Sequence, residues 1–334
     1  VLTVVPANPA GAKPKRELTV MSQNLYLGAS LDAAVGAGTP ELFFKAVATI
    51  WGTVQFTDFP ARSEAIADEI QARSPDLIGL QEVSKWTTSG PTPAGIDFLE
   101  VLLADLGKRG LSYSVAAVSE NAEIGPVPLG APCAGPFSSC LLTFRDRDVI
   151  LVNDERAELE VFNPQSDLFD EQAVLPTPVG PLSFDRGWAS VDGTLEGKKF
   201  RFVNTHLETG AFPAVQEAQA QEFLLGPAKV GGAVVAVGDF NSRADGRSTA
   251  SYEILTKSYF RDAWDTAQGD GFTCCQNETL TNDTSQLTSR IDLVLTHAAA
   301  RAQSAEVIGD EPFQIAPPLW PSDHAGVVSV VRIH

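Results

Sequence analysis

The chain has 334 residues, is 44% hydrophobic and carries a formal net charge of −18. Its length and apolar content allow a sizeable core. Such an acidic chain repels anionic surfaces at long range, which argues against tight nonspecific binding to nucleic acid, although a local basic cleft or a bound metal could reverse the local field. No apolar run reaches the roughly 20 residues of a membrane span, so we expect no stable membrane insertion.

The first residues, Val1 to Ala12 (VLTVVPANPAGA), are typical of the apolar end and small-residue cleavage site of a signal peptide. They predict a secreted or extracytoplasmic protein, in which residues 1–17 are an N-terminal tail. Strand-like and helix-like segments interleave over residues 18–334 without a linker or internal repeat. This pattern favours a single α/β domain, and we expect a monomer.

Apolar periodicity, capping residues and turn residues predict the elements of this domain. Helices are expected over residues 40–51, 60–73, 98–106 and 213–225. Strands are expected over residues 18–21, 77–80, 141–144, 148–153, 158–162, 188–193, 199–208, 233–241, 289–295 and 324–333. Residues 121–137 are expected to form a loop.

The four cysteines suggest disulfides in an exported chain. Cys133 and Cys140 bracket a loop of Pro, Gly and Ser whose ends are easily bridged, so we predict a disulfide there. Cys274 and Cys275 are adjacent and form either a vicinal bridge or two free thiols. Neither pair has the spacing of a zinc site.

Polar side chains recur at or near the ends of the predicted strands. They are Asn24, Glu82, His206, Asp239, Asn241, Asp292, Asp323 and His324. Each alone is more commonly a surface, turn or structural residue. Together they combine hard oxygen ligands, which suit Mg²⁺ and also Mn²⁺ or Ca²⁺, with imidazoles suited to proton transfer. This combination predicts metal-assisted hydrolysis of a phosphate ester.

The motifs that carry these residues occur in a fixed order along the chain. They are MSQNLYLG, PDLIGLQEV, VNTHLE, VGDFNS, SRIDLVL and PSDHAGV. Through them, from about Leu18 to Ile333, the chain resembles the endonuclease/exonuclease/phosphatase (DNase I-like) superfamily. The resemblance implies a four-layer α-β-β-α sandwich, in which two packed mixed β-sheets are flanked by helices. It also implies a metal-dependent phosphodiesterase.

The resemblance assigns roles to the carboxylates and amides. Glu82 is expected to be the principal metal ligand, with Asn24 and Asp323 beside it. Asp239 is expected to orient or deprotonate the attacking water, and Asn241 to donate to the phosphate or the attacking group.

The resemblance also assigns roles to two histidines. His324, held by Asp292, is expected at the scissile phosphate. His206 is expected to donate a proton to the leaving oxygen or to stabilise the phosphate. A carboxylate beside an imidazole fixes its tautomer and raises its pKa. The candidates for the partner of His206 are Glu123 and Asn121.

Other residues bear on the substrate. Lys85, Trp86 and Arg186 are the substrate-binding candidates. Lys85 and Trp86 either contact a phosphate and stack on a base or lie on a rim that faces lipid. Further positive charge is available from Arg145, Arg147 and Arg243. Residues 29–57 and 133–140 are interpreted as additions to a minimal nuclease that shape specificity.

Two substrate classes stay open. The acidic balance favours a phospholipid head-group hydrolase of the sphingomyelinase or phospholipase C type. The alternative is a DNase I-like nuclease acting on nucleic acid. A non-catalytic binding module with this fold would be expected to have lost a ligand or a histidine, and none is missing.

Overall fold

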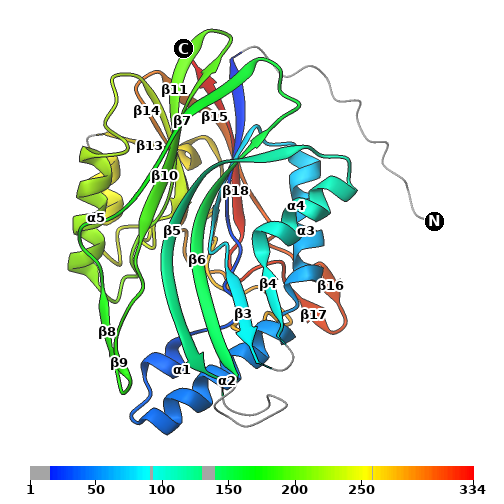
Figure 1. Ribbon diagram of the computed structural model, residues 1–334. Coiled ribbons are helices and arrows are strands. Elements are labelled where there is room, and N and C mark those ends of the chain that lie inside the picture. The colour runs from blue at the N-terminus through cyan, green and yellow to red at the C-terminus, as the bar shows by residue number, and fades with distance from the viewer. Residues whose placement is uncertain (1–15, 91–92, 130–139, 258) are drawn as a thin grey trace.

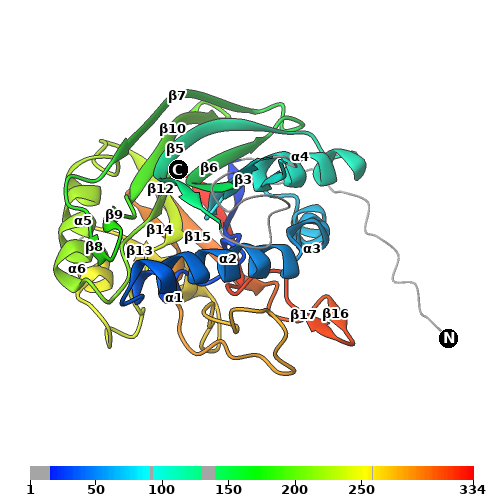
Figure 2. The same ribbon diagram turned by 60° about the horizontal axis from the view of Figure 1, so that its bottom comes forward.

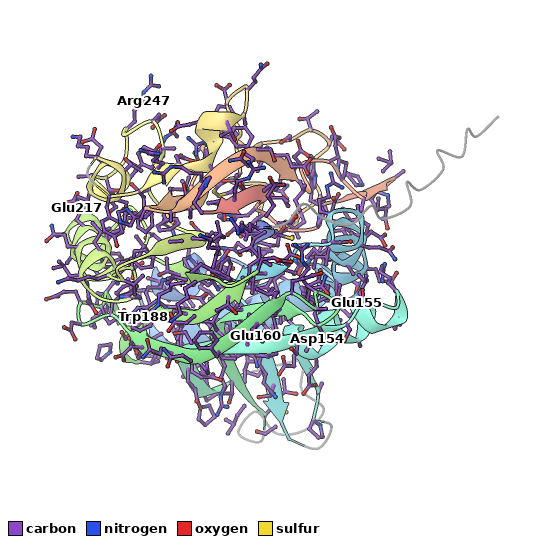
Figure 3. The ribbon with its side chains drawn as sticks, turned by 90° about the horizontal axis from the view of Figure 1, so that it is seen from above. Asp154, Glu155, Glu160, Trp188, Glu217 and Arg247 are labelled. Carbon is purple, nitrogen blue, oxygen red and sulfur yellow. A yellow bond between two sulfur atoms is a disulfide. The ribbon has the colours of Figure 1, made fainter. Side chains whose placement is uncertain are left out.

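The computed structural model describes residues 16–90, 93–129, 140–257 and 259–334. Two large mixed β-sheets pack face to face, and helices cover the outer face of each sheet (Figure 1). This arrangement confirms the predicted four-layer α-β-β-α sandwich. The surplus of acidic residues lies partly on the surface, where Asp154, Glu155 and Glu160 are exposed at the periphery (Figure 3).

The first sheet has eight strands in the order β15-β18-β1-β2-β6-β3-β4, with β5 also paired to β6. Their bounds are β1 Glu17–Asn24, β2 Leu77–Gln81, β3 Lys85–Ser89, β4 Gly95–Asp97, β5 Tyr113–Pro128, β6 Leu141–Asn153, β15 Ala300–Ile308 and β18 Gly326–Ile333. Strand β1 runs parallel to β2 and antiparallel to β18. The C-terminal ends of β1 and β2 and the N-terminal end of β18 therefore lie at the same end of the sheet.

The second sheet has six strands in the order β13-β14-β12-β11-β10-β7. Their bounds are β7 Leu159–Leu168, β10 Gly187–Leu195, β11 Lys198–His206, β12 Ala233–Asp239, β13 Arg261–Asp262 and β14 Asp292–His297. Every residue of β12 is buried, because both faces of the sheet are covered. Strands β11 and β12 are parallel, and β14 is antiparallel to β12, so His206, Asp239 and Asp292 lie side by side.

Two small hairpins complete the strands. They are β8 Val174–Thr177 with β9 Gly180–Ser183, and β16 Gln314–Ile315 with β17 Pro318–Leu319.

Helices cover the two sheets. Their bounds are α1 Asp32–Val35, α2 Pro40–Phe56, α3 Phe59–Arg73, α4 Phe98–Lys108, α5 Pro213–Leu225 and α6 Ser251–Thr256, with a 3₁₀ turn at Ala263–Thr266. Helix α2 begins where the Thr39 hydroxyl accepts a hydrogen bond from Leu42 N (3.3 Å). None of the described helices is both long and apolar enough to cross a membrane.

Helices α1 to α4 pack on the eight-stranded sheet, whereas α5 and α6 pack on the six-stranded sheet. Helices α1 and α2 also extend across one end of the sandwich (Figures 1 and 2). This is the segment that the sequence analysis interprets as an addition to a minimal nuclease.

The interface between the sheets combines an apolar core with polar contacts, among them those of Asn204. Val20 and Leu77 of the first sheet pack with the second sheet in a single buried cluster. The buried Asn204 of β11 donates through Nδ2 to Leu80 O (2.8 Å) and to Val149 O (3.1 Å) across the interface. These bonds fix how the two sheets sit on each other, and hence how the site residues of one sheet face those of the other.

The expected loop over residues 121–137 is partly wrong, because β5 continues to Pro128. Its pairing with β6 shifts register at three places, and many of its residues are exposed. Such an irregular strand lacks the strict alternation by which strands are identified from sequence. Residues 130–139 lie outside the described residues.

Candidate active site

The predicted site residues gather at the shared end of the two sheets. Asn24 ends β1 and Glu82 follows β2, while His206 and Asp239 end β11 and β12. Glu82 and Asn241, just after their strands, have φ angles of 55° and 50°. Backbone in this left-handed region is uncommon for residues other than glycine, and it turns both side chains back toward the strand ends.

His324 is the charged histidine of the site. Its Nδ1 donates to Asp292 Oδ2 at 2.8 Å, and its Nε2 lies 3.9 Å from Asp239 Oδ2. Burial lowers the pKa of His324, but the carboxylates of Asp292, Asp323 and Asp239 outweigh it and hold this pKa well above its usual range. This shift favours the imidazolium form of the ring, whose Nε2 faces Asp239.

Asp239 faces both histidines. Its Oδ1 accepts a hydrogen bond from Asn241 N (2.9 Å), and its Oδ2 accepts one from Asn24 Nδ2 (3.2 Å). Burial and the nearby charge of Asp292 raise the pKa of Asp239 to about 7, against the opposing effect of His324. A carboxylate with a pKa near the working pH can accept a proton from water.

His206 differs from His324 because its neighbour is a cation. Arg186 Nη1 lies 3.0 Å from His206 Nδ1, and since an arginine can only donate, Nδ1 must accept. The ring proton is then on Nε2, which lies 3.4 Å from the acceptor Asp239 Oδ2. Asn241 Nδ2 is 3.0 Å from the same nitrogen, but it is itself a donor, to Leu207 O (3.0 Å), and so does not accept this proton. Burial first, then the charges of Arg186 and His324, hold the pKa of His206 well below its usual range. His206 is therefore neutral.

The prediction of Glu123 or Asn121 as the partner of His206 is wrong. Glu123 pairs with Arg145 at 3.0 Å, and Asn121 Oδ1 accepts a hydrogen bond from Ser119 Oγ at 2.9 Å. Arg186, expected to bind substrate, occupies the position beside the ring. It comes from the irregular segment between β9 and β10, and nothing in the pattern of β11 or β12 indicates that this segment reaches His206.

A cleft of about 710 Å³ lies next to these residues, and Arg186, the neighbour of His206, is part of its lining. Its lining includes Glu82, Asp146, Asp323, Glu208 and Arg186. Burial and the charge of Asp323 raise the pKa of Glu82, and burial and the charge of Glu82 raise the pKa of Asp146 to about 7. Burial likewise raises the pKa of Asp323. Several carboxylates thus repel one another in one poorly hydrated place.

This donor set fits a divalent cation. Glu82 and Asp323 line the cleft, and Asn24 lies beside them, with its Oδ1 accepting from Tyr26 N at 2.8 Å. Oxygen donors of this kind suit Mg²⁺, Mn²⁺ or Ca²⁺, and a cation would relieve the repulsion between the carboxylates. A different group, Asp239, Asp292 and His324, has ligand atoms that all lie within 4.8 Å of one another. In that group the Asp292 to His324 hydrogen bond already occupies one ring nitrogen.

Asp146 is a cleft residue that the sequence analysis missed, and Asp148 is buried next to it on β6. The two residues are two positions apart on a strand, so they point to the same side. A pair of acidic residues alternating within an apolar strand was the available signal.

Lys85 and Trp86 are not brought to the cleft. Lys85 pairs with Asp97 at 3.1 Å. Trp86 is only 2% exposed, and its Nε1 donates to Leu27 O at 2.9 Å. It therefore presents no open face on which a base could stack.

Two of the cysteines lie at the edge of the site. Cys274 and Cys275 are joined by a disulfide, and Cys275 Sγ lies 3.8 Å from His324 Nε2. Cys140 is buried, but Cys133 lies outside the described residues. The pairing of Cys133 with Cys140 stays a prediction.

Comparison with known structures places this fold among similar sandwiches. A crystal structure of an endonuclease/exonuclease/phosphatase from Bacteroides vulgatus is 17% identical, with a TM-score of 0.58 over 96% of this chain and 100% of that one. Truncated Caenorhabditis elegans TDP2 is 18% identical, with a TM-score of 0.52 over 95% and 97% of the two chains. A mannosyl-6-phosphatase from Bacteroides thetaiotaomicron is 18% identical, with a TM-score of 0.56 over 94% and 99%.

No curated protein sequence matches the chain. The model of the endonuclease/exonuclease/phosphatase family, however, matches residues 24–324, which run from the first to the last of the site residues. The chain therefore belongs to the endonuclease/exonuclease/phosphatase family of phosphoester hydrolases.

Proposed function

We propose that this protein is a Mg²⁺-dependent phosphodiesterase that acts on the head groups of zwitterionic phospholipids. The observation that carries the chemistry is the pair formed by Asp239, whose pKa is about 7, and the imidazolium of His324 beside it. One group can accept a proton, and the other can stabilise anionic oxygen. We assign the cation to Glu82, Asp323 and Asn24, where it would neutralise charge on the phosphate and the leaving oxygen when bound.

The attacking water gives its proton to Asp239 while its oxygen forms the new bond to phosphorus and the bond from phosphorus to the leaving alcohol oxygen breaks. The leaving oxygen takes its proton from solvent water. Asn24 and Asn241 hold the two carboxylate oxygens of Asp239 in place. His324 donates its Nε2–H to a non-bridging phosphate oxygen and balances the charge that develops there. His324 Nε2 lies only 3.9 Å from Asp239 Oδ2, so these two groups act on the same side of the phosphorus. This position argues against His324 as the proton donor to a leaving oxygen on the opposite side.

His206 acts as a neutral donor in this scheme. Arg186 fixes its tautomer, so that Nε2–H faces Asp239. Because the cationic Arg186 opposes protonation, His206 can offer a hydrogen bond but does not supply an acidic proton at neutral pH.

The charges around the cleft favour a small head group over a nucleic acid. Its lining includes Asp32, Glu208 and Glu278 in addition to the carboxylates of the expected metal site. These side chains complement the cationic end of a zwitterionic head group, whereas a nucleic acid would need a row of free cations along its phosphates.

The arginines that the sequence analysis considered as a source of positive charge are each engaged with an acid. Arg145 pairs with Glu123, Arg147 with Asp97, and Arg243 with Asp245. Export stays part of the proposal, and the disulfide between Cys274 and Cys275 is compatible with an oxidising compartment.

The test is hydrolysis in Mg²⁺ of sphingomyelin and phosphatidylcholine in mixed micelles, of duplex DNA and of mannose 6-phosphate, each with an EDTA blank. We expect cleavage of the lipids alone, abolished by EDTA and by His324→Gln. His334→Gln, an exposed histidine outside the site, is the matched control and should retain full activity. Cleavage of DNA alone, or of the monoester alone, would refute the proposed substrate class.

A further inference from the structure

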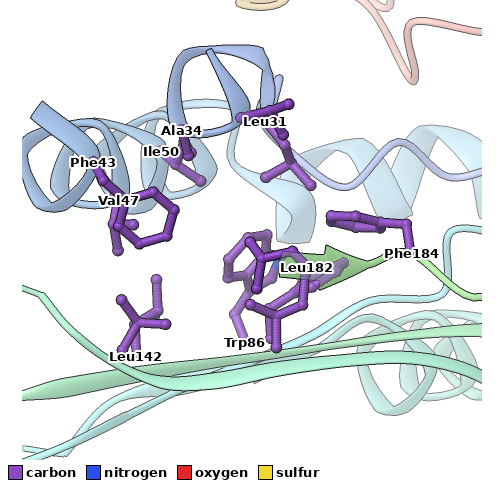
Figure 4. Close-up of a pocket in the computed structure, with 13 residues that line it drawn as sticks. Leu31, Ala34, Phe43, Val47, Ile50, Trp86, Leu142, Leu182 and Phe184 are labelled. Atoms are coloured by element: carbon purple, nitrogen blue, oxygen red, sulfur yellow. The ribbon is translucent and has the colours of Figure 1, made fainter. Parts of the chain in front are cut away.

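A second pocket adjoins the cleft and has no part in the chemistry described above. It lies between helices α1 and α2 on one side and strands β3, β5 and β6 on the other (Figure 4). The described residues that line it are all apolar or aromatic, among them Ala34, Val47, Ile50, Leu142 and Leu182. We call it the apolar pocket.

The apolar pocket lies next to the cleft. Leu31, Val35 and Phe184 line both spaces. The floor is tied to the site as well, because Trp86 donates to Leu27 O at 2.9 Å while Leu27 N donates to Glu82 Oε2 at 2.7 Å. Leu27 therefore links Trp86, which lines the pocket, to Glu82, the expected metal ligand.

The chemistry of the pocket selects an apolar occupant. The indole N–H of Trp86 is the polar side-chain group in its lining, and that N–H is already engaged. Its volume of about 50 Å³ would admit roughly four water-sized groups at the usual 10–15 Å³ each. Water in the pocket would find no polar partners for its hydrogen bonds. Methylene groups would make dispersion contacts with the lining and would be removed from bulk water.

We propose that the apolar pocket binds the first part of an alkyl chain of the substrate, to a depth of about four methylene groups. The occupant is the hydrocarbon part of a phospholipid whose phosphate lies over Asp239 and Glu82 in the cleft. The inference rests on the proposed function and deepens it, since the pocket then sets the preference for a lipid. Helices α1 and α2, which form one wall, supply specificity without contributing a catalytic group.

The experiment is a chain-length series of monomeric alkylphosphocholines, from ethyl to octyl, with kcat/KM measured in Mg²⁺. Burial of each methylene should raise kcat/KM about four-fold until roughly four are buried, after which the gain should level off. Ala34→Phe, which fills the pocket, should remove this dependence, so that kcat/KM of the variant is no higher on the octyl compound than on the ethyl compound. Ala33→Phe, an exposed neighbour on the same helix, should behave as the wild type.

A second measurement covers the case in which Ala34→Phe does not fold. Val35 is half-buried and lines both the apolar pocket and the cleft, so Val35→Trp narrows the space between them. Binding of dodecylphosphocholine is followed by tryptophan fluorescence quenching in EDTA, where no turnover is expected. We expect saturable binding to the wild type and at least ten-fold weaker binding to the variant. A wild-type enzyme that cleaves all the compounds at the same rate would overturn the pocket assignment alone. No cleavage of any compound, with binding intact, would instead overturn the proposed function.

Discussion

The replacement Arg62→Met tests what holds the loops of the site in place. Arg62 on α3 is completely buried and donates its hydrogen bonds to backbone carbonyls, while the carboxylates of Asp323 and Glu82 also favour its charge. It donates to Leu25 O (2.7 Å), Pro321 O (2.9 Å) and Thr57 O (3.0 Å). Leu25 follows the ligand Asn24, so one guanidinium joins the segments on either side of the site. Burial lowers the pKa of Arg62 to about 10.

Methionine fills a similar volume but donates nothing. Each carbonyl left unpaired in a buried place costs about 1–3 kcal/mol, although removal of the charge returns part of its desolvation cost. Breaking such a buried cationic network typically costs about 3–5 kcal/mol, and we expect a loss of that size in the free energy of unfolding. A domain with about 5–15 kcal/mol of total stability would remain folded but weakened.

The assay is urea unfolding followed by fluorescence and by circular dichroism. The matched control is Arg247→Met, because the Arg247 side chain is 81% exposed, and its effect should stay within about 0.5 kcal/mol. Arg62→Lys retains the charge with fewer, differently placed donors and should lie between the two. If Arg62→Met costs less than about 1 kcal/mol with an unchanged slope, the guanidinium does not support these loops and the reasoning is refuted.

Three further replacements address the site and the sheet interface. Glu82→Gln should lower turnover at least ~10²-fold and weaken Mg²⁺ binding, measured by calorimetry. In EDTA it should raise the melting temperature, because it removes one of the carboxylates that repel one another, and a lower melting temperature would contradict that repulsion. Asp292→Asn should lower the pKa of His324 in an NMR titration and reduce turnover at least ~10²-fold, and an unchanged pKa would exclude the carboxylate as its cause. Gly79→Ala should destabilise the protein by about 1–3 kcal/mol in urea unfolding, because the added Cβ would lie 2.3 Å from Val237 Cγ2. A variant as stable as the wild type would mean that the two sheets move apart enough to accommodate the methyl group.

The strand ends of the site could be predicted because parallel neighbours bring distant motifs to one edge. Asn24 aligns with the end of β2, and His206 aligns with Asp239, as the register of the two parallel pairs requires. Each motif combines an apolar strand with a polar end, so both the strand and the position of its polar residue are readable from local sequence.

The electrostatic partners could not be predicted in the same way. Arg186 reaches His206 from the irregular segment between β9 and β10, and Arg62 reaches the loops from a helix. Nothing in the local pattern around either arginine says which distant atoms it will meet. Trp86 shows a related limit, since a five-residue strand of mixed polarity does not reveal which of its faces packs on α2.

The pairing of β1 with β18 has a consequence for protein synthesis. Ser322 Oγ donates to Asn24 O at 2.8 Å, although the two residues are 298 positions apart. At the ribosome's pace of ~5–20 residues per second, the second of these residues is made on the order of 15–60 s after the first. Until β18 inserts beside β1, a growing chain lacks Asp323 and His324 and has an open sheet edge. The nascent chain is therefore inactive. During that interval its unpaired sheet edge is a site at which chaperones are expected to bind.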